Sequence, residues 1–266
     1  MLLNIRHETI CRTAQPVPYS IRQLRLTPRR EATQRAVSWR ISAPGRVRQM
    51  TDAYGNVAHL MTLDRPLAEI SIVVTGQVET ADADTHVLAD PGAISPLAYL
   101  TETPLTRADE AILQLAHDHV RTGADRMRSL MDLMPEIASR VVAPAGAPGG
   151  ERSAPEVFAQ GQGSSEDHAH LFIACCRSRG IPARYVSGYL YTGAHPDTAA
   201  QAWAEAWIDG YGWVSFDVTR SRLAGGEYCR LAVGRDYLDA CPVRSVRRDT
   251  ELVSSVRVDA QQQQQQ

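Results

Sequence analysis

Residues 161–190 read GQGSSEDHAHLFIACCRSRGIPARYVSGYL and carry the clearest structural signals in the chain. Two serines and two acids precede an apolar run, which is the composition of a helix N-terminus. The run from Ala169 to Cys176 is nearly continuous, so we predict a helix over 166–178 that is buried on most sides. Gly180 ends this helix just before Pro182, and residues 183–191 then favour a strand.

The sequence on either side of this stretch extends the pattern. Downstream, residues 200–219 read AQAWAEAWIDGYGWVSFDVT and predict strands at 202–209 and 212–217, joined as a hairpin by Asp-Gly-Tyr-Gly. Upstream, residues 108–120 and 124–142 have helical spacing, whereas the Pro- and Gly-rich stretch 143–155 predicts a loop. One buried helix followed by antiparallel strands is an α+β core.

The first 82 residues have a different sequence pattern, in which short β-favouring runs alternate with turn signals about every dozen residues. This pattern predicts a β-sandwich-like region. A stretch rich in Asp, Ala, Pro and Gly follows at 83–96 and suggests a connection. We therefore divide the chain into a β-rich region at 1–95, an α+β core at 96–258 and a disordered Gln-rich tail at 259–266.

Composition excludes several classes of function. All 28 basic residues are arginine, so a lysine Schiff base, a P-loop lysine and a lysine general base are excluded. The net charge of −2, with arginines spread along the chain, argues against a nucleic-acid partner. No apolar run approaches the ~20 residues of a membrane helix, so we expect no membrane partner.

The cysteines indicate the compartment. There are five, an odd number, without a C-x-x-C pair: Cys11, Cys175, Cys176, Cys229 and Cys241. The spacing predicts neither a zinc site nor a redox motif. We expect a cytoplasmic protein with core thiols and no cofactor.

The C-terminal half resembles the bacterial transglutaminase-like domain. Its pattern G-x-G-V-C-Q-D-x-A-H, R-x-x-G-I-P-A-R-Y-V-S-G-Y, H-A-W-x-E and G-W-x-x-F-D-P-T is matched by the two stretches quoted above. The first half is similar to the β-rich N-terminal region of that family, since IRHET, LRLTPR, DAYGN and GQVET follow in order. The resemblance covers nearly the whole chain and implies a papain-type core.

The resemblance also implies a catalytic triad. In the family a cysteine at the N-terminus of the buried helix is the nucleophile, a histidine on the next strand is the base, and an aspartate orients it. A thiolate is favoured there by the helix dipole and an imidazolium. Here the first two positions hold Ser165 and Gln201, and only Asp217 is kept. A serine needs a base, and a carboxamide has no protonation step near neutral pH, so cysteine-type catalysis is not expected.

Other interpretations of these positions stay open. Ser165 fits a helix cap, and Gln201 could donate to Asp217 while accepting from Ser165, a neutral version of the dyad. His168, one turn along the helix, or His195, in the loop before Gln201, could serve as a relocated base.

Neighbouring groups have simpler explanations. His170 matches a family histidine and suits a hydrogen-bonded structural role. Asp167 with the three histidines is a conceivable metal site, but adjacent helical positions point in different directions, so we predict no metal. Arg184 and Arg235 suit ion pairs or backbone anchors at the edge of the core more than substrate clamps.

The favoured function is that of a catalytically inactive transglutaminase-like protein with a cleft for a peptide or protein partner. The resemblance implies a peptide-processing context, because relatives are often encoded beside an ATP-grasp-like protein, an alpha-helical companion domain and a proteasome-related peptidase. Two alternatives remain. The first is an amide-bond hydrolase or acyltransferase using Ser165 with His168 or His195, and the second is a structural subunit of an active paralogue.

Overall fold

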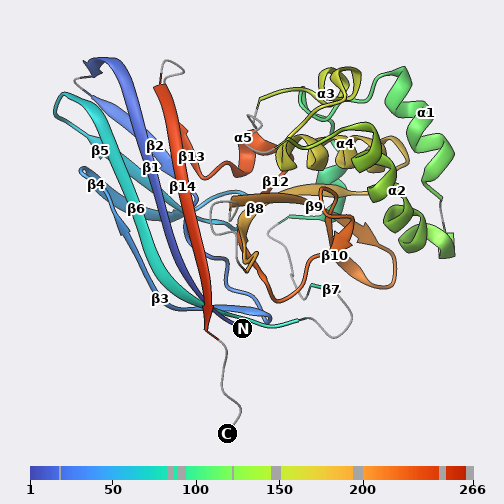
Figure 1. Ribbon diagram of the computed structural model, residues 1–266, viewed down its shortest axis with the longest axis horizontal. Coiled ribbons are helices and arrows are strands. Elements are labelled where there is room, and N and C mark those ends of the chain that lie inside the picture. Colours follow the sequence, from blue (N-terminus) through green and yellow to red (C-terminus); the bar gives the residue numbers. More distant parts are fainter. Residues whose placement is uncertain are drawn as a thin grey trace, which may run out of the picture.

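The helix predicted from the central stretch lies at the centre of the helical part of the molecule (Figure 1). In the computed structural model, which describes residues 1–17, 19–82, 87–88, 94–121, 123–144, 151–193, 200–245 and 250–261, this helix is α4 (Ser165–Ser178). Every residue from Asp167 to Arg177 is buried. A helix that is apolar almost all round has to be covered on every side.

Helices and a sheet provide that cover. The other helical segments are η1 (Pro96–Leu100), α1 (Glu110–His119), η2 (Gly123–Asp125), α2 (Arg126–Arg140), α3 (Ala154–Gln160) and α5 (Tyr237–Ala240). The contacts of α4 are with α1, α2, α3, β8 (Ala183–Leu190) and β9 (Ala200–Ile208). The two predicted helices therefore exist. A third helix that was not predicted, α3, begins at the end of the predicted loop with a capping box between Ser153 and Glu156.

The core sheet is antiparallel and has the order β11-β10-β9-β8-β12, with β7 (Val87–Leu88) paired to β10. Its remaining strands are β10 (Gly212–Asp217), β11 (Arg222–Leu223) and β12 (Tyr228–Gly234). The predicted hairpin is confirmed by the pairing of Trp213 with Trp207. Because α4 packs on β8 and β9, the N-terminus of this helix lies next to the start of β9.

The N-terminal part contains two further antiparallel sheets. One has the order β14-β1-β6-β3 and the other β13-β2-β5-β4. Their strands are β1 (Leu2–Val17), β2 (Ser20–Leu24), β3 (Gln34–Ser42), β4 (Arg46–Thr51), β5 (Val57–Leu63), β6 (Leu67–Thr80), β13 (Val243–Ser245) and β14 (Thr250–Gln261). Both sheets contribute to one hydrophobic cluster, which also takes in Tyr189, Cys229 and Leu231 of the core sheet. The β-rich part is thus joined to the core through β8 and β12.

The C-terminal end of the chain corrects the predicted division. β14 pairs along its length with β1, from Thr250 opposite Thr13 to Gln261 opposite Leu2, and β13 pairs with β2. In Figure 1 the red strand β14 lies beside the blue strand β1. Residues 243–245 and 250–258 therefore complete the N-terminal sheets and not the core. The predicted tail is strand as far as Gln261, and residues 262–266 lie outside the described residues.

The helices are short and carry charged residues. Among the described residues, none of the helices has the length and apolar content to cross a membrane.

Candidate functional site

The N-terminus of α4 is built by two glycines and a capping box. Gly161 has φ +67 and ends α3, a left-handed position that favours glycine. A Cβ on Gly163 would come within 2.9 Å of the Asp167 side chain, so this residue allows close packing. Ser164 is the N-cap, and the Asp167 carboxylate accepts from its backbone N–H at 2.8 Å. The G-x-G sequence therefore shapes the helix start, and capping falls to Ser164 and not to Ser165.

Ser165, at the nucleophile position, is the first residue of α4 and is partly exposed. Its Oγ donates to Glu166 Oε2 at 3.3 Å and accepts from the backbone N–H of Ala202 at 3.3 Å. Both distances are at the long end for hydrogen bonds. The predicted bond from Ser165 to the Gln201 carbonyl oxygen is not formed, because the hydroxyl proton is directed to a carboxylate instead.

Gln201, at the base position, is bonded to Asp217. Its Nε2 donates to Asp217 Oδ2 at 3.0 Å, as the neutral dyad predicts. Asp217 is completely buried and accepts three further bonds, from the Tyr228 hydroxyl at 2.6 Å, the Arg220 backbone N–H at 3.1 Å and the Arg220 guanidinium at 3.5 Å. Burial, and then the charge of Asp217, raises the pKa of Tyr228 above its ordinary value, so its hydroxyl stays a donor. The buried carboxylate is satisfied without an imidazole.

His168 is not placed to serve Ser165. It is buried, its Nε2 is 2.7 Å from the Val141 carbonyl oxygen, and its Nδ1 is 2.9 Å from Thr219 Oγ1. Because a carbonyl only accepts, Nε2 carries the proton and Nδ1 accepts from the threonine. Burial lowers the pKa of His168, which favours this neutral form. The structure therefore contradicts the use of His168 as the relocated base.

The other candidates fall into two groups. His170 is buried, and its Nε2 accepts from the backbone N–H of Tyr237 at 3.0 Å, which confirms its structural role. His195 lies outside the described residues. In the part of the chain that is described, no three His, Cys, Asp or Glu side chains are grouped to hold a metal. All five cysteines are buried, and Cys175 and Cys176 lie in the core cluster.

Comparison with protein families matches both halves of the chain. Residues 114–218 match the Transglutaminase-like superfamily, and residues 3–79 match the Bacterial transglutaminase-like N-terminal region. The chain belongs to the transglutaminase-like superfamily. Its α+β class is confirmed, and the sandwich-like description of the N-terminal region stays a prediction.

Relatives of this transglutaminase-like protein extend over almost its whole length. An uncharacterised protein of Mycobacterium leprae is 27% identical, with 92% of each chain covered. One from Mycobacterium bovis is 26% identical, with 91% of this chain and 86% of that protein covered. A crystal structure from Cytophaga hutchinsonii, described as a candidate cysteine protease, has a TM-score of 0.79 at 20% identity, covering all of this chain and 92% of that one. At this identity the likeness shows the fold alone.

The Ala-Trp-x-Glu part of the family motif has a structural role here. Glu205, on β9, is completely buried between Arg184 at 2.7 Å and Arg230 at 2.9 Å, and accepts from the Ser215 hydroxyl at 3.0 Å. The Arg184 guanidinium also lies 4.1 Å from the ring centre of Trp213. Arg184 therefore forms the ion pair expected from the sequence. Arg235 is paired too, with Asp239 at 2.8 Å.

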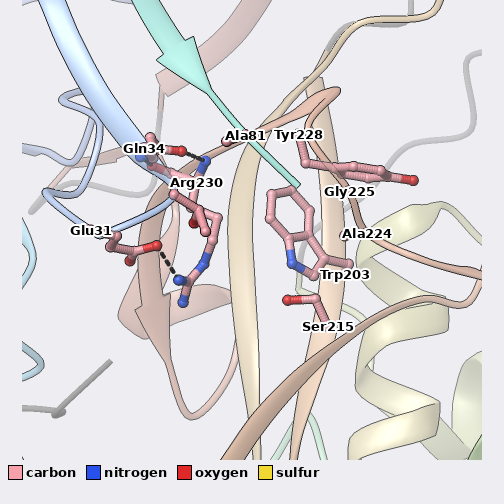
Figure 2. Close-up of a pocket in the computed structure, with 10 residues that line it drawn as sticks. Glu31, Gln34, Ala81, Trp203, Ser215, Ala224, Gly225, Tyr228 and Arg230 are labelled. Atoms are coloured by element: carbon pink, nitrogen blue, oxygen red, sulfur yellow. Dashed lines mark hydrogen bonds and ion pairs between the residues drawn. The ribbon is translucent and has the colours of Figure 1, made fainter. Parts of the chain in front are cut away.

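A small cavity lies beside this network, where the N-terminal region meets the core (Figure 2). Figure 2 shows Arg230 bonded to Glu31 on one side, with the indole nitrogen of Trp203 directed towards Ser215. The cavity has a volume of about 30 Å³, and the Trp203 Nε1 has no hydrogen-bond partner among the described residues. That volume suits about one water molecule. The cavity is too small for a peptide side chain, so it is not a substrate site.

Sequence reasoning missed three groups of the site: Glu166, Arg220 and Tyr228. The sequence marks Glu166 only as an acid favoured by the helix dipole, yet it holds the Ser165 hydroxyl. Arg220 follows Asp217 by three residues, a spacing that could have suggested the contact. No sequence signal pointed to Tyr228, which comes from β12 at the far end of the core sheet.

Proposed function

We propose that this transglutaminase-like protein is catalytically inactive and uses the region around its degenerate triad to bind a peptide or protein partner. The observation that carries the proposal is the Gln201–Asp217 bond of 3.0 Å. It places a carboxamide where amide-bond chemistry needs a base, and a carboxamide neither accepts nor returns a proton near neutral pH. The Ser165 hydroxyl, which has no such base, keeps its proton.

Room for a partner exists beside the triad. An open groove of about 550 Å³ is lined by Met1, Tyr191, Thr192, Arg220, Arg222 and Glu227. Arg220 joins this groove to the buried site, since its guanidinium also reaches Asp217 at 3.5 Å. A volume of this size is within the usual range of ligand pockets. In this proposal the two N-terminal sheets, which share one hydrophobic cluster, form a sandwich that supports the core.

Thiol reactivity tests whether the site geometry is kept. We would compare Ser165→Cys with Ser165→Cys/Gln201→His by iodoacetamide alkylation at pH 7, read by mass spectrometry. The double variant restores the thiol and imidazole, so we expect the alkylation rate of its introduced thiol to exceed that of the single variant by about tenfold, because the imidazolium lowers the thiol pKa. The five buried native cysteines provide the internal background. Equal rates in the two variants would mean that the cleft geometry has been lost.

Activity of the unmodified protein tests the absence of catalysis. A fluorophosphonate probe should leave Ser165 unlabelled, and Ser165→Ala should leave partner binding unchanged. Labelling of Ser165, with loss of amidase activity in Ser165→Ala, would refute the proposal.

A second candidate is an amide-bond hydrolase or acyltransferase that uses Ser165. The contact from Ser165 to Glu166 favours it, because a carboxylate is the acceptor of the hydroxyl proton. A carboxylate is a weaker base than imidazole, so this pair alone supplies little activation. If Ser165 is labelled, loss of the label in Glu166→Gln identifies the carboxylate as the base, and loss in His195→Ala identifies the histidine.

The biological setting is part of the proposal. We infer a cytoplasmic, peptide-processing context, with an ATP-grasp-like, alpha-helical companion or proteasome-related protein as the partner. A purely structural subunit of an active paralogue would share the same contacts. Co-purification of such a paralogue, with activity that depends on its own cysteine, would distinguish the subunit role.

A further inference from the structure

The open side of the N-terminal sheets carries two strand edges with a groove between them. β3 ends the order β14-β1-β6-β3, and β4 ends the order β13-β2-β5-β4. Each is paired on one side only within the described residues. A groove of about 1210 Å³ lies between them, lined by β3, β4, β5 and residues 27–31. In Figure 1, β4 lies at the left edge of the molecule, away from the helices.

The strand β4 is unusual because all six of its residues are exposed. Its side chains divide between two faces, since successive residues of a strand point in opposite directions. Val47 and Gln49 line the groove, and Val47 is 38% exposed. Arg46 and Arg48 face the other side. The edge thus presents one face, with Val47 and Gln49, to the groove and a second face that carries Arg46 and Arg48.

The arginines of this face form none of the ion pairs of the described residues. Residues 32–51 contain four arginines and no aspartate or glutamate. Arg35 is paired with Glu79, whereas Arg40, Arg46 and Arg48 take part in none of the ion pairs of the described residues. Glu31, which lines the groove, is almost completely buried and is held by Arg29 and Arg230. The free charge at this edge is therefore positive.

We propose that the β4 edge binds an extended segment of a partner protein in which acidic and apolar residues alternate. A strand added to an edge forms backbone hydrogen bonds with it, and its side chains lie opposite those of the edge strand. Residues opposite Val47 and Gln49 would enter the groove, and those opposite Arg46 and Arg48 would pair with the arginines. A second copy of the same edge would bring like charges together, which argues against self-pairing. This site lies outside the degenerate triad and does not depend on it.

A synthetic peptide tests the assignment with the full chain. The probe is a fluorescein-labelled octapeptide of alternating glutamate and valine, measured by fluorescence anisotropy at about 50 mM salt, where the Debye length exceeds 10 Å. We expect saturable binding. Its affinity should fall at least about tenfold in Arg46→Glu/Arg48→Glu, and it should also fall as salt is added. Arg128→Glu, which reverses a surface arginine of α2, is the matched control and should bind as the wild type does.

Two modified peptides separate strand addition from simple attraction between charges. Replacing the glutamates by lysine should abolish binding, and N-methylation of alternate amides should weaken it because the methyl groups remove the backbone donors. Equal binding of the N-methylated peptide, or of the Arg46→Glu/Arg48→Glu variant, would overturn the proposal. So would a dimer in light scattering that dissociates in that variant while the peptide fails to bind.

Discussion

Replacing Glu205 by glutamine should destabilise the protein strongly without any direct effect on the triad positions. The carboxylate is fully buried, and its two partners Arg184 and Arg230 are 1% and 6% exposed. The substitution keeps the shape of the side chain and removes its charge. Arg230 retains its ion pair with Glu31, whereas Arg184 loses its ion pair with Glu205 and keeps its contact with the Trp213 ring. Removing one partner of such a buried pair costs about 3–5 kcal/mol.

Urea unfolding followed by tryptophan fluorescence measures this loss. Glu69→Gln is the matched control, because its pair with Arg12 is 51% and 55% exposed and should contribute about 0–1 kcal/mol. If Glu205→Gln does not fold, the pair Glu205→Leu/Arg184→Met should recover a folded protein, since both buried charges are then removed together. A loss in Glu205→Gln no larger than that in Glu69→Gln, with equal m-values, would refute the reasoning.

Three further predictions concern buried groups elsewhere. Burial lowers the pKa of His7 from 6.5 to about 4, so unfolding binds a proton between these pH values and stability falls as the pH drops through this window. Urea titrations should show His7→Gln reducing the slope of unfolding free energy against pH by up to about 1.4 kcal/mol per pH unit there. Burial also raises the pKa of Cys175 to about 12, so this thiol should react with a maleimide at pH 8 only after denaturation, and native labelling would contradict the buried assignment. Gly188→Ala should lower the melting temperature more than Gly180→Ala, because its Cβ would meet the Cys229 carbonyl oxygen at 2.3 Å whereas the left-handed Gly180 has open space. If calorimetry instead gave the lower melting temperature for Gly180→Ala, the backbone around Gly188 would have to move enough to accommodate a Cβ.

Local patterns predict the core well because its elements carry strong local signals. Helix α4 combines a capping sequence, an apolar run and a terminal glycine, and its bounds are within one residue of those predicted. The hairpin of β9 and β10 follows from its Asp-Gly turn. Strand β1 has no such signal, since its inward face includes the polar residues His7 and Thr9. These two are bonded to each other and to Tyr189 and Ser254, partners that come from distant parts of the chain.

The C-terminal strand shows a different limit. β14 pairs with β1 across more than 230 residues of sequence, as in the pairs Leu2–Gln261 and Thr13–Thr250. The composition of residues 250–261 does not identify the partner strand, because pairing depends on which sheet edge the rest of the fold leaves open. The glutamine-rich composition predicts a disordered tail from residue 259, whereas the strand continues to Gln261.

The positions of the candidate site and the Gln201–Asp217 bond were predictable from the sequence, whereas its other bonds were not. Motif spacing placed residues 165, 201 and 217 correctly enough for Gln201 to reach Asp217 and for Ser165 to reach Ala202. The direction of the Ser165 proton depends on the Glu166 rotamer, and the bond from Tyr228 depends on β12, whose register relative to β8 shifts between Arg230 and Ala232. Side-chain geometry of this kind is fixed only by tertiary packing.

The bonds around Asp217 also explain how this buried carboxylate is satisfied with glutamine where the family motif has histidine. A completely buried carboxylate is costly unless donors surround it. An apolar residue at position 201 would remove one donor from Asp217, whereas glutamine provides an N–H to the same oxygen that Tyr228 already contacts. The substitution thus preserves the hydrogen bonding of the site while removing its proton-transfer group. Hydrogen bonding to Asp217 and proton transfer are separate requirements at this position, and in the proposed inactive protein Gln201 meets only the first.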